Sequence, residues 1–227
     1  MSDREIKVYR DLLGANEEWA RKTREWLNEK GILALNLIGS PGSGKTTLLE
    51  AMVKGFGGRL RLAVLEGDVE TTYDAERLHA LGIPVSQLLT GGACHLEAKM
   101  VHAALRDLPA DRIDVVIVEN VGNLVCPAEF DIGEWAKIGV LSVTEGEDKP
   151  AKYPLLFREA RAVIVTKTDL LPHVPMRLEG LMEHLRKIHD GVPVFQVCAL
   201  RGEGIEPWVS WVLEQRGRMA AQRERKP

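Results

Sequence analysis

The stretch "GSPGSGKTT", residues 39–47, follows the apolar run "ILALNLI" and precedes the helix-like sequence "LLEAMVKGF". A glycine-rich turn between a buried strand and a helix can point backbone N–H groups at phosphate oxygens. The lysine adds positive charge, and the hydroxyl that follows it can bind Mg²⁺. A glycine turn that binds nothing is the alternative, but the flanking strand and helix argue against it. The residues that we expect to hold phosphates are Gly39, Gly42, Ser43, Gly44, Lys45, Thr46 and Thr47.

Apolar runs alternate with helix-like segments on both sides of this loop. The runs typical of buried strands are residues 32–38, 60–65, 113–118, 140–143, 162–165 and 194–198. The helix-like segments are residues 45–55, 74–81, 96–108, 177–188 and 207–215. Parallel strands need crossovers, which place helices on both faces of a sheet. We therefore expect an α/β fold of the P-loop NTPase type, with a doubly wound, mainly parallel sheet of about seven strands.

The chain divides into three parts. Residues 1–30 read as an amphipathic helix or helix pair, residues 31–215 as the nucleotide-binding domain, and the arginine-rich residues 216–227 as a frayed tail. The 227 residues carry a net charge of −3, which gives no reason to expect nucleic acid binding, and contain no apolar run long enough to span a membrane. Three cysteines are too few for a disulfide framework. We expect a cytoplasmic protein with reduced thiols.

Carboxylates end two of the expected strands. "LAVLEGD" ends with Glu66 and Asp68, and "DVVIVEN" contains Glu119 near its end. The carboxyl ends of parallel strands form the ligand crevice, so these acids should lie near Thr46. Asp68 is our first choice for holding Mg²⁺ and orienting water, with Glu119 as its partner. Lys45, Asp68 and Glu119 are thus the predicted catalytic residues, and the alternative for each acid is a helix cap.

The sequence "AVIVTKTDLLP" indicates which base is bound. Asp169 can accept hydrogen bonds from both N1–H and the amino group of guanine, a pair of donors that adenine lacks. The stem of Lys167 can lie over the ring. Guanine motifs of this kind usually begin with Asn, so Thr166 is expected to make only part of the usual contacts to the phosphate loop. The sequence favours GTP and GDP as ligands.

A second base-contacting loop is expected at "CALRGEG", where Cys198, Ala199 and Leu200 would line the base pocket. Cys198 has two interpretations. It is either a small residue of this pocket, which we favour, or a metal ligand.

The stretch "TGGACHLEAKM", residues 90–100, places Cys94 beside His95. Thiolate and imidazole suit Zn²⁺ and Ni²⁺, whereas Mg²⁺ prefers oxygen ligands. Neighbouring side chains diverge on helices and strands, so the pair can share one ion only at a turn, which "TGG" supplies. From these residues alone, metal ligands and inert small side chains both remain possible.

Several stretches together resemble the HypB family, the GTPases that assist nickel insertion into [NiFe] hydrogenase. The motifs that carry the resemblance are "LNLIGSPGSGKTTLLE", "EGDVETTYDAERL", "TGGACHLEAKMV", "VENVGNLVCPAEFDIGE", "SVTEGEDKPAKYP" and "TKTDLLP". The resemblance implies a metallochaperone whose site for Ni²⁺ or Zn²⁺ falls on Cys94, His95 and Cys126. One chain would then be one ligand short of a tetrahedral site, so water or a second subunit would complete it.

The resemblance also implies a GTP-stabilised homodimer whose loops respond to the nucleotide. Its expected partners are a nickel-delivering accessory protein and the hydrogenase large subunit, and intrinsic GTP hydrolysis should be slow. Residues 1–30 contain neither Cys nor His, so we expect no nickel-storage motif there. Lys149 could be structural or could reach the nucleotide of a partner subunit.

Two other functions remain open. The urease accessory GTPases share the nucleotide machinery but carry a Cys-Pro-His element, whereas this chain has Cys126-Pro127-Ala128. The other alternative is a nucleotide-gated scaffold in which the thiols are purely structural.

Overall fold

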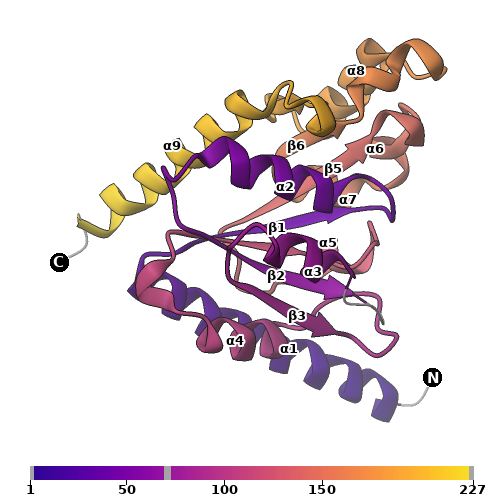
Figure 1. The fold of residues 1–227 in the computed structure, drawn as a ribbon. Coiled ribbons are helices and arrows are strands. Elements are labelled where there is room, and N and C mark those ends of the chain that lie inside the picture. Colours follow the sequence, from indigo (N-terminus) through magenta and orange to yellow (C-terminus); the bar gives the residue numbers. More distant parts are fainter. Residues whose placement is uncertain (1–2, 69–72, 225–227) are drawn as a thin grey trace.

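The computed structural model describes residues 3–68 and 73–224, with side chains described for residues 14–68 and 73–223. Its centre is a seven-stranded sheet in the order β3-β2-β4-β1-β5-β6-β7, in which every pairing is parallel (Figure 1). The strands are β1 (Leu33–Gly39), β2 (Leu62–Asp68), β3 (Val85–Leu89), β4 (Val115–Glu119), β5 (Ala136–Ser142), β6 (Ala160–Thr166) and β7 (Val194–Gln196). The α/β, doubly wound P-loop NTPase fold expected from the sequence is confirmed.

Helices cover both faces of the sheet. They are α1 (Asp3–Lys30), α2 (Lys45–Phe56), α3 (Tyr73–His79), α4 (Ala98–Asp107), α5 (Cys126–Glu129), α6 (Lys149–Lys152), α7 (Pro154–Glu159), α8 (Leu178–Ile188) and α9 (Ile205–Glu224). The helices α2 and α9 share one apolar core with the sheet, while α1 and α4 share a core on the opposite face (Figure 1). A third core joins α7 and α8 to the strands β5 and β6.

The central strands explain where the site lies. All seven residues of β1 and all five of β4 are buried, as expected for strands covered on both faces. The register pairs Leu37 with Glu119 on one side, and pairs Glu66 with Glu119 on the other. The phosphate loop and both glutamates are therefore brought to the same edge of the sheet.

The structure differs from the sequence-based expectation at β3 and decides between two expectations at α1. The sequence does not predict β3, because it is a short edge strand whose middle is the polar pair Ser86 and Gln87. Residues 3–30 form a single helix, where a helix pair is an equal possibility from the sequence. None of the described helices is long and apolar enough to cross a membrane.

The C-terminal segment is the clearest correction. Fraying is expected for residues 216–227, but residues 216–224 continue α9 to Glu224, and residues 225–227 lie outside the described part of the chain. Met219 is buried in the core below α2 and α9, and Arg223 Nη2 donates to the carbonyl of Glu29 at 2.8 Å. The charged composition of this segment hides the apolar contact that keeps it helical.

Candidate functional site

The phosphate loop joins β1 to α2 and is held by its own lysine. Gly44 has φ 87° and ψ 24°, a left-handed conformation that favours glycine directly before the helix. Lys45 is buried, and its Nζ donates to the carbonyls of Gly39 and Ser40, each at 3.3 Å. A lysine that bridges loop carbonyls keeps its charge inside the ring of backbone groups that would surround a phosphate.

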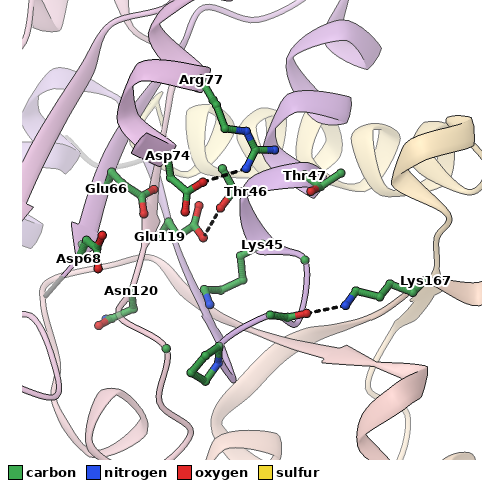
Figure 2. A pocket seen from close by; sticks show the side chains of 15 residues that line it. Lys45, Thr46, Thr47, Glu66, Asp68, Asp74, Arg77, Glu119, Asn120 and Lys167 are labelled. Atoms are coloured by element: carbon green, nitrogen blue, oxygen red, sulfur yellow. Dashed lines mark hydrogen bonds and ion pairs between the residues drawn. The ribbon is translucent and has the colours of Figure 1, made fainter. Parts of the chain in front are cut away.

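A cavity of about 580 Å³ opens at the carboxyl end of the sheet, beside this loop. Figure 2 shows side chains from the phosphate loop, β2, α3 and β4 converging on it. The predicted residues that line it are Gly42, Gly44, Lys45, Thr46, Thr47, Asp68, Glu119 and Lys167. The three residues predicted to be catalytic therefore share one cavity.

Two buried glutamates lie beside the Thr46 hydroxyl. Thr46 Oγ1 donates to Glu119 Oε1 at 3.0 Å. Burial, and then the charge of Glu119, raise the pKa of Glu66 to about 10. Burial also raises the pKa of Glu119, although the nearby charge of Lys45 and the hydrogen bond from Thr46 oppose that shift. We therefore assign the proton to Glu66 and the negative charge to Glu119.

This group of side chains fits a hydrated Mg²⁺ ion. The Oε2 atom of Glu119 is buried and has no hydrogen-bond partner. A buried carboxylate oxygen without a partner is costly, and a hard cation that prefers oxygen ligands would satisfy it. Thr46 offers its hydroxyl to the same point, and Asp68 lines the same cavity (Figure 2).

The sequence analysis does not identify Asp74 and Arg77 as site residues, yet both line the phosphate cavity. Arg77 forms ion pairs with Asp74 at 2.8 Å and with Glu50 at 3.0 Å. The sequence predicts a helix across "YDAERLH", but nothing in it indicates that α3 faces the phosphate loop. In this structure Arg77 is held by carboxylates rather than directed at the phosphate position.

All the predicted base-contacting residues line a second cavity, of about 190 Å³. Its lining comprises Gly44, Thr47, Thr166, Lys167, Asp169, Leu170, Cys198, Ala199 and Leu200. Cys198 is only 1% exposed, and burial raises the pKa of its thiol. Its position supports the interpretation as a small residue of the base pocket.

Thr166 ties this pocket to the phosphate loop more directly than expected. Its Oγ1 donates to the carbonyl of Ser43 at 2.6 Å. Next to it, Lys167 has φ 57°, and its Nζ donates to the carbonyl of Gly42 at 2.6 Å. The threonine hydroxyl therefore reaches the phosphate loop. Lys167 lines the base pocket, and its amino group contacts the phosphate loop (Figure 2).

Cys94, His95 and Cys126 form a compact group, called here the Cys/His group. Their potential ligand atoms all lie within 4.8 Å of one another. Cys94 Sγ is 2.9 Å from Cys126 Sγ and 3.6 Å from His95 Nδ1. A disulfide requires about 2.05 Å, so the two cysteines are thiols. The structure brings together the three residues on which the family's metal site falls.

The imidazole of His95 has a fixed orientation and a pKa that suit metal binding. Its ring stacks on that of Phe130, with centroids 3.8 Å apart. Burial lowers the pKa of His95, which favours the neutral ring that metals bind. The hydrogen bond with Cys94 raises the pKa of Cys126 while no ion is bound. Two thiols and one imidazole are a donor set for Zn²⁺ or Ni²⁺ and leave a fourth position open.

Lys149 is engaged within its own chain. Its Nζ lies 3.5 Å from Glu145 Oε2 and 5.1 Å from the ring centroid of Tyr153. Glu145 in turn caps the turn after β5 through its contact with the Ser142 backbone. These contacts give Lys149 a structural role in the single chain.

The phosphate loop, the guanine-type pocket and the parallel sheet define a P-loop GTPase class of nucleotide-binding protein. The family model described as CobW/HypB/UreG, nucleotide-binding domain, matches residues 33–196. The chain belongs to this family, and within it to the HypB hydrogenase maturation factors.

Individual relatives support this assignment. The hydrogenase maturation factor HypB of Azotobacter vinelandii is 45% identical over 214 residues, which cover 94% of this chain and 71% of the relative. The hydrogenase/urease maturation factor HypB of Helicobacter pylori is 38% identical and is matched over 90% of its length, with 95% of this chain covered. A crystal structure of HypB from Helicobacter pylori in complex with nickel matches with a TM-score of 0.86 and 36% identity, covering 90% of this chain and 96% of that one.

Proposed function

We propose that this protein is a GTP-hydrolysing metallochaperone that helps to insert nickel into [NiFe] hydrogenase. One observation carries the proposal: a Cys-His-Cys group lies beside the phosphate-site strands. Cys126 follows β4, which bears Glu119, and Cys94 and His95 follow β3, the strand paired with β2, which bears Glu66 and Asp68. Relatives at up to 45% identity over most of the chain are named hydrogenase maturation factors, in agreement with that role.

GTP would bind with its phosphates in the loop at residues 39–47 and its base in the pocket of Thr166, Lys167 and Asp169. Thr46, Asp68 and Glu119 would hold Mg²⁺, directly or through water, and Lys45 would neutralise charge on the phosphates. The Mg²⁺ ion would further stabilise the charge that develops on the phosphoryl oxygens. Arg77, the arginine that lines the phosphate cavity, is held by Asp74 and Glu50, which supports slow intrinsic hydrolysis.

The Cys/His group would bind Ni²⁺ or Zn²⁺ as cargo. Because one chain supplies three ligands, a second copy related by a twofold axis would bring a second group of thiols to the ion. Cys94 is exposed, as an intersubunit site requires. GTP would order the loops and stabilise this homodimer, and hydrolysis would release the metal to the hydrogenase large subunit.

Metal titration of the full chain tests this proposal. Wild type and Cys94→Ala would be titrated with Ni²⁺ and with Zn²⁺, with and without a non-hydrolysable GTP analogue, while sedimentation reports the oligomeric state. We expect wild type to bind metal, to dimerise with the analogue and to hold metal more tightly as the dimer. Equal stoichiometry in both proteins would instead favour a nucleotide-gated scaffold with structural thiols.

Urease maturation is a second candidate, because the Helicobacter pylori relative is named a hydrogenase/urease maturation factor. The urease accessory GTPases carry histidine after Cys-Pro, but here Ala128 takes that position and is buried against α7. The alanine at this position favours a role in hydrogenase maturation over one in urease maturation. Adding nickel-loaded protein to metal-free hydrogenase precursor and to metal-free urease would distinguish the two, with activation of the hydrogenase expected.

A further inference from the structure

Residues 119–126, "ENVGNLVC", join the two halves of the site and are called here the linking segment. They begin at Glu119, which accepts the Thr46 hydroxyl, and end at Cys126 of the Cys/His group. Between them, Gly122 lies against the phosphate loop, since an added Cβ would stand 2.6 Å from Pro41 Cγ. The linking segment therefore contacts the nucleotide site at two points before it reaches the metal ligand.

Asn123 connects this segment to the loop that carries Cys94. Its Nδ2 donates to the carbonyl of Cys94 at 3.2 Å, and its Oδ1 accepts from the backbone N–H of Val125 at 2.9 Å. Cys94 and Cys126 are 32 positions apart in the sequence. The side chain of Asn123 holds the backbone of Cys94 close to that of Val125, the residue before Cys126. The amide group of Asn123 offers both the donor and the acceptor that these two contacts need.

Asn120 makes a parallel connection deeper in the molecule. Its Oδ1 accepts from the N–H of Leu96 at 3.4 Å, next to His95, and its Nδ2 donates to Asn36 Oδ1 on β1 at 3.1 Å. Asn120 is buried directly after the carboxyl end of β4, whereas Asn123 is partly exposed in the loop that follows. Asn120 holds the Cys94 loop at Leu96, close to the sheet, and Asn123 holds it at Cys94, where the thiol lies.

We propose that Asn123 is a positioning residue that sets the distance between the Cys94 and Cys126 sulfurs. The inference rests on the metal-binding role proposed above, but the thiol geometry that it explains exists without metal. Residues that orient metal ligands without binding the ion themselves typically contribute a factor of about 10 to 100 in metal affinity. Asn123 would give this contribution without touching the ion.

The first measurement is the affinity for Ni²⁺ and Zn²⁺ in wild type, Asn123→Ala, Asn123→Asp and the exposed control Asn28→Ala. Both Asn123 variants should bind metal about 10- to 100-fold more weakly and lose intensity in the nickel–thiolate absorption bands. Asn123→Asp keeps the acceptor for Val125 and removes the Nδ2 donor, which serves the carbonyl of Cys94 and also lies beside Cys126. Weaker metal binding by this variant assigns the effect to that donor. Affinity for a GTP analogue and the melting temperature should match those of Asn28→Ala.

The second measurement needs no metal. Diamide oxidises two thiols to a disulfide, and their two protons and two electrons reduce its N=N bond to the hydrazine. The rate of Cys94–Cys126 crosslinking, followed by mass spectrometry of the diluted protein, reports how often the sulfurs meet. It should fall about 3- to 10-fold in Asn123→Ala, which corresponds to one lost hydrogen bond.

The outcomes separate this inference from the proposed function. Wild-type metal affinity and crosslinking in both Asn123 variants, together with loss of metal in Cys94→Ala, would overturn the positioning role and leave the metallochaperone standing. Slow crosslinking in Asn123→Ala, in a protein whose wild type binds no metal, would overturn the metallochaperone and keep the positioning role.

Discussion

The phosphate site and the Cys/His group lie close together but are built in different ways. The phosphate site comes from adjacent central strands, its lysine and threonine are buried, and its contacts are already made. The Cys/His group comes from two loops, includes an exposed thiol and is held by side-chain amides. The packed core thus fixes the geometry of the nucleotide site before a ligand binds. The geometry of the Cys/His group depends instead on loop positions that a ligand or a second subunit can shift.

The largest expected effect breaks the phosphate site alone. Lys45→Ala should lower the rate of GTP hydrolysis about 10²- to 10³-fold, because the buried charge that stabilises the transferred phosphoryl group is lost. Single-turnover hydrolysis measures this, with Lys54→Ala, exposed on the same helix, as the control. Hydrolysis at the wild-type rate in Lys45→Ala would rule out the role assigned to this lysine.

The next largest effect breaks the Cys/His group alone. Cys126→Ser should weaken Ni²⁺ binding by at least about 100-fold, since removing a ligand costs more than disturbing its surroundings. The buried Cys198→Ser, outside the group, is the matched control and should keep the metal. GTP hydrolysis measured with Mg²⁺ but without Ni²⁺ should stay normal in Cys126→Ser. A metal affinity that fell equally in both would show that the loss comes from general destabilisation.

A pH-dependent effect should appear in the phosphate site. Folding raises the pKa of Glu66 to about 10, so between about pH 4.5 and 10 the folded chain keeps a proton that the unfolded chain releases. Wild-type stability in this window therefore falls as pH rises. Glu66→Gln cannot titrate, so its stability advantage should grow from near zero at pH 4.5 to about 2 kcal/mol at pH 6, by about 1.4 kcal/mol for each pH unit.

Urea unfolding at several pH values, without Mg²⁺ or nucleotide, measures this difference. Glu17→Gln, exposed on α1, provides the control for the substitution itself. A difference between Glu66→Gln and wild type that stays constant from pH 5 to 9 would mean that Glu66 is ionised in the folded protein.

The smallest expected effect concerns the tie between the phosphate loop and the base pocket. Thr166→Val should cost about 1 kcal/mol of stability and weaken GTP binding several-fold, because the carbonyl of Ser43 loses its donor. Thr166→Asn should restore most of this, as its amide can donate to the same carbonyl. Calorimetric titration with GTP and ATP measures both affinities. Tighter binding of ATP than of GTP by wild type would contradict the guanine assignment.

The sequence predicts best what is contiguous. The phosphate loop can be recognised because Gly39, Gly44, Lys45 and Thr46 lie within one short stretch between a buried strand and a helix. Glu119 can be placed near Thr46 because parallel strands deliver their ends to one edge. The family resemblance identifies Cys94, His95 and Cys126, which the residues alone leave ambiguous.

What escapes prediction depends on contacts between distant parts of the chain. The proton on Glu66 follows from its burial and then from the charge of Glu119 on the neighbouring strand, which no local pattern encodes. Arg77 faces the cavity because of how α3 packs, and Asn123 matters only because its loop meets that of Cys94. Residues 216–224 look too charged to be ordered, because the buried Met219 is the only large apolar side chain among them.

The long C-terminal helix has a practical consequence for anyone who shortens this protein. A chain cut after Gln215 would look safe from composition, yet it would lack the buried Met219 and the guanidinium of Arg223 that holds the end of α1 through Glu29. Such a shortened protein should melt at a lower temperature although its nucleotide pocket is intact in sequence. Affinity tags and fluorophores are better attached beyond Pro227, with every turn of this helix retained.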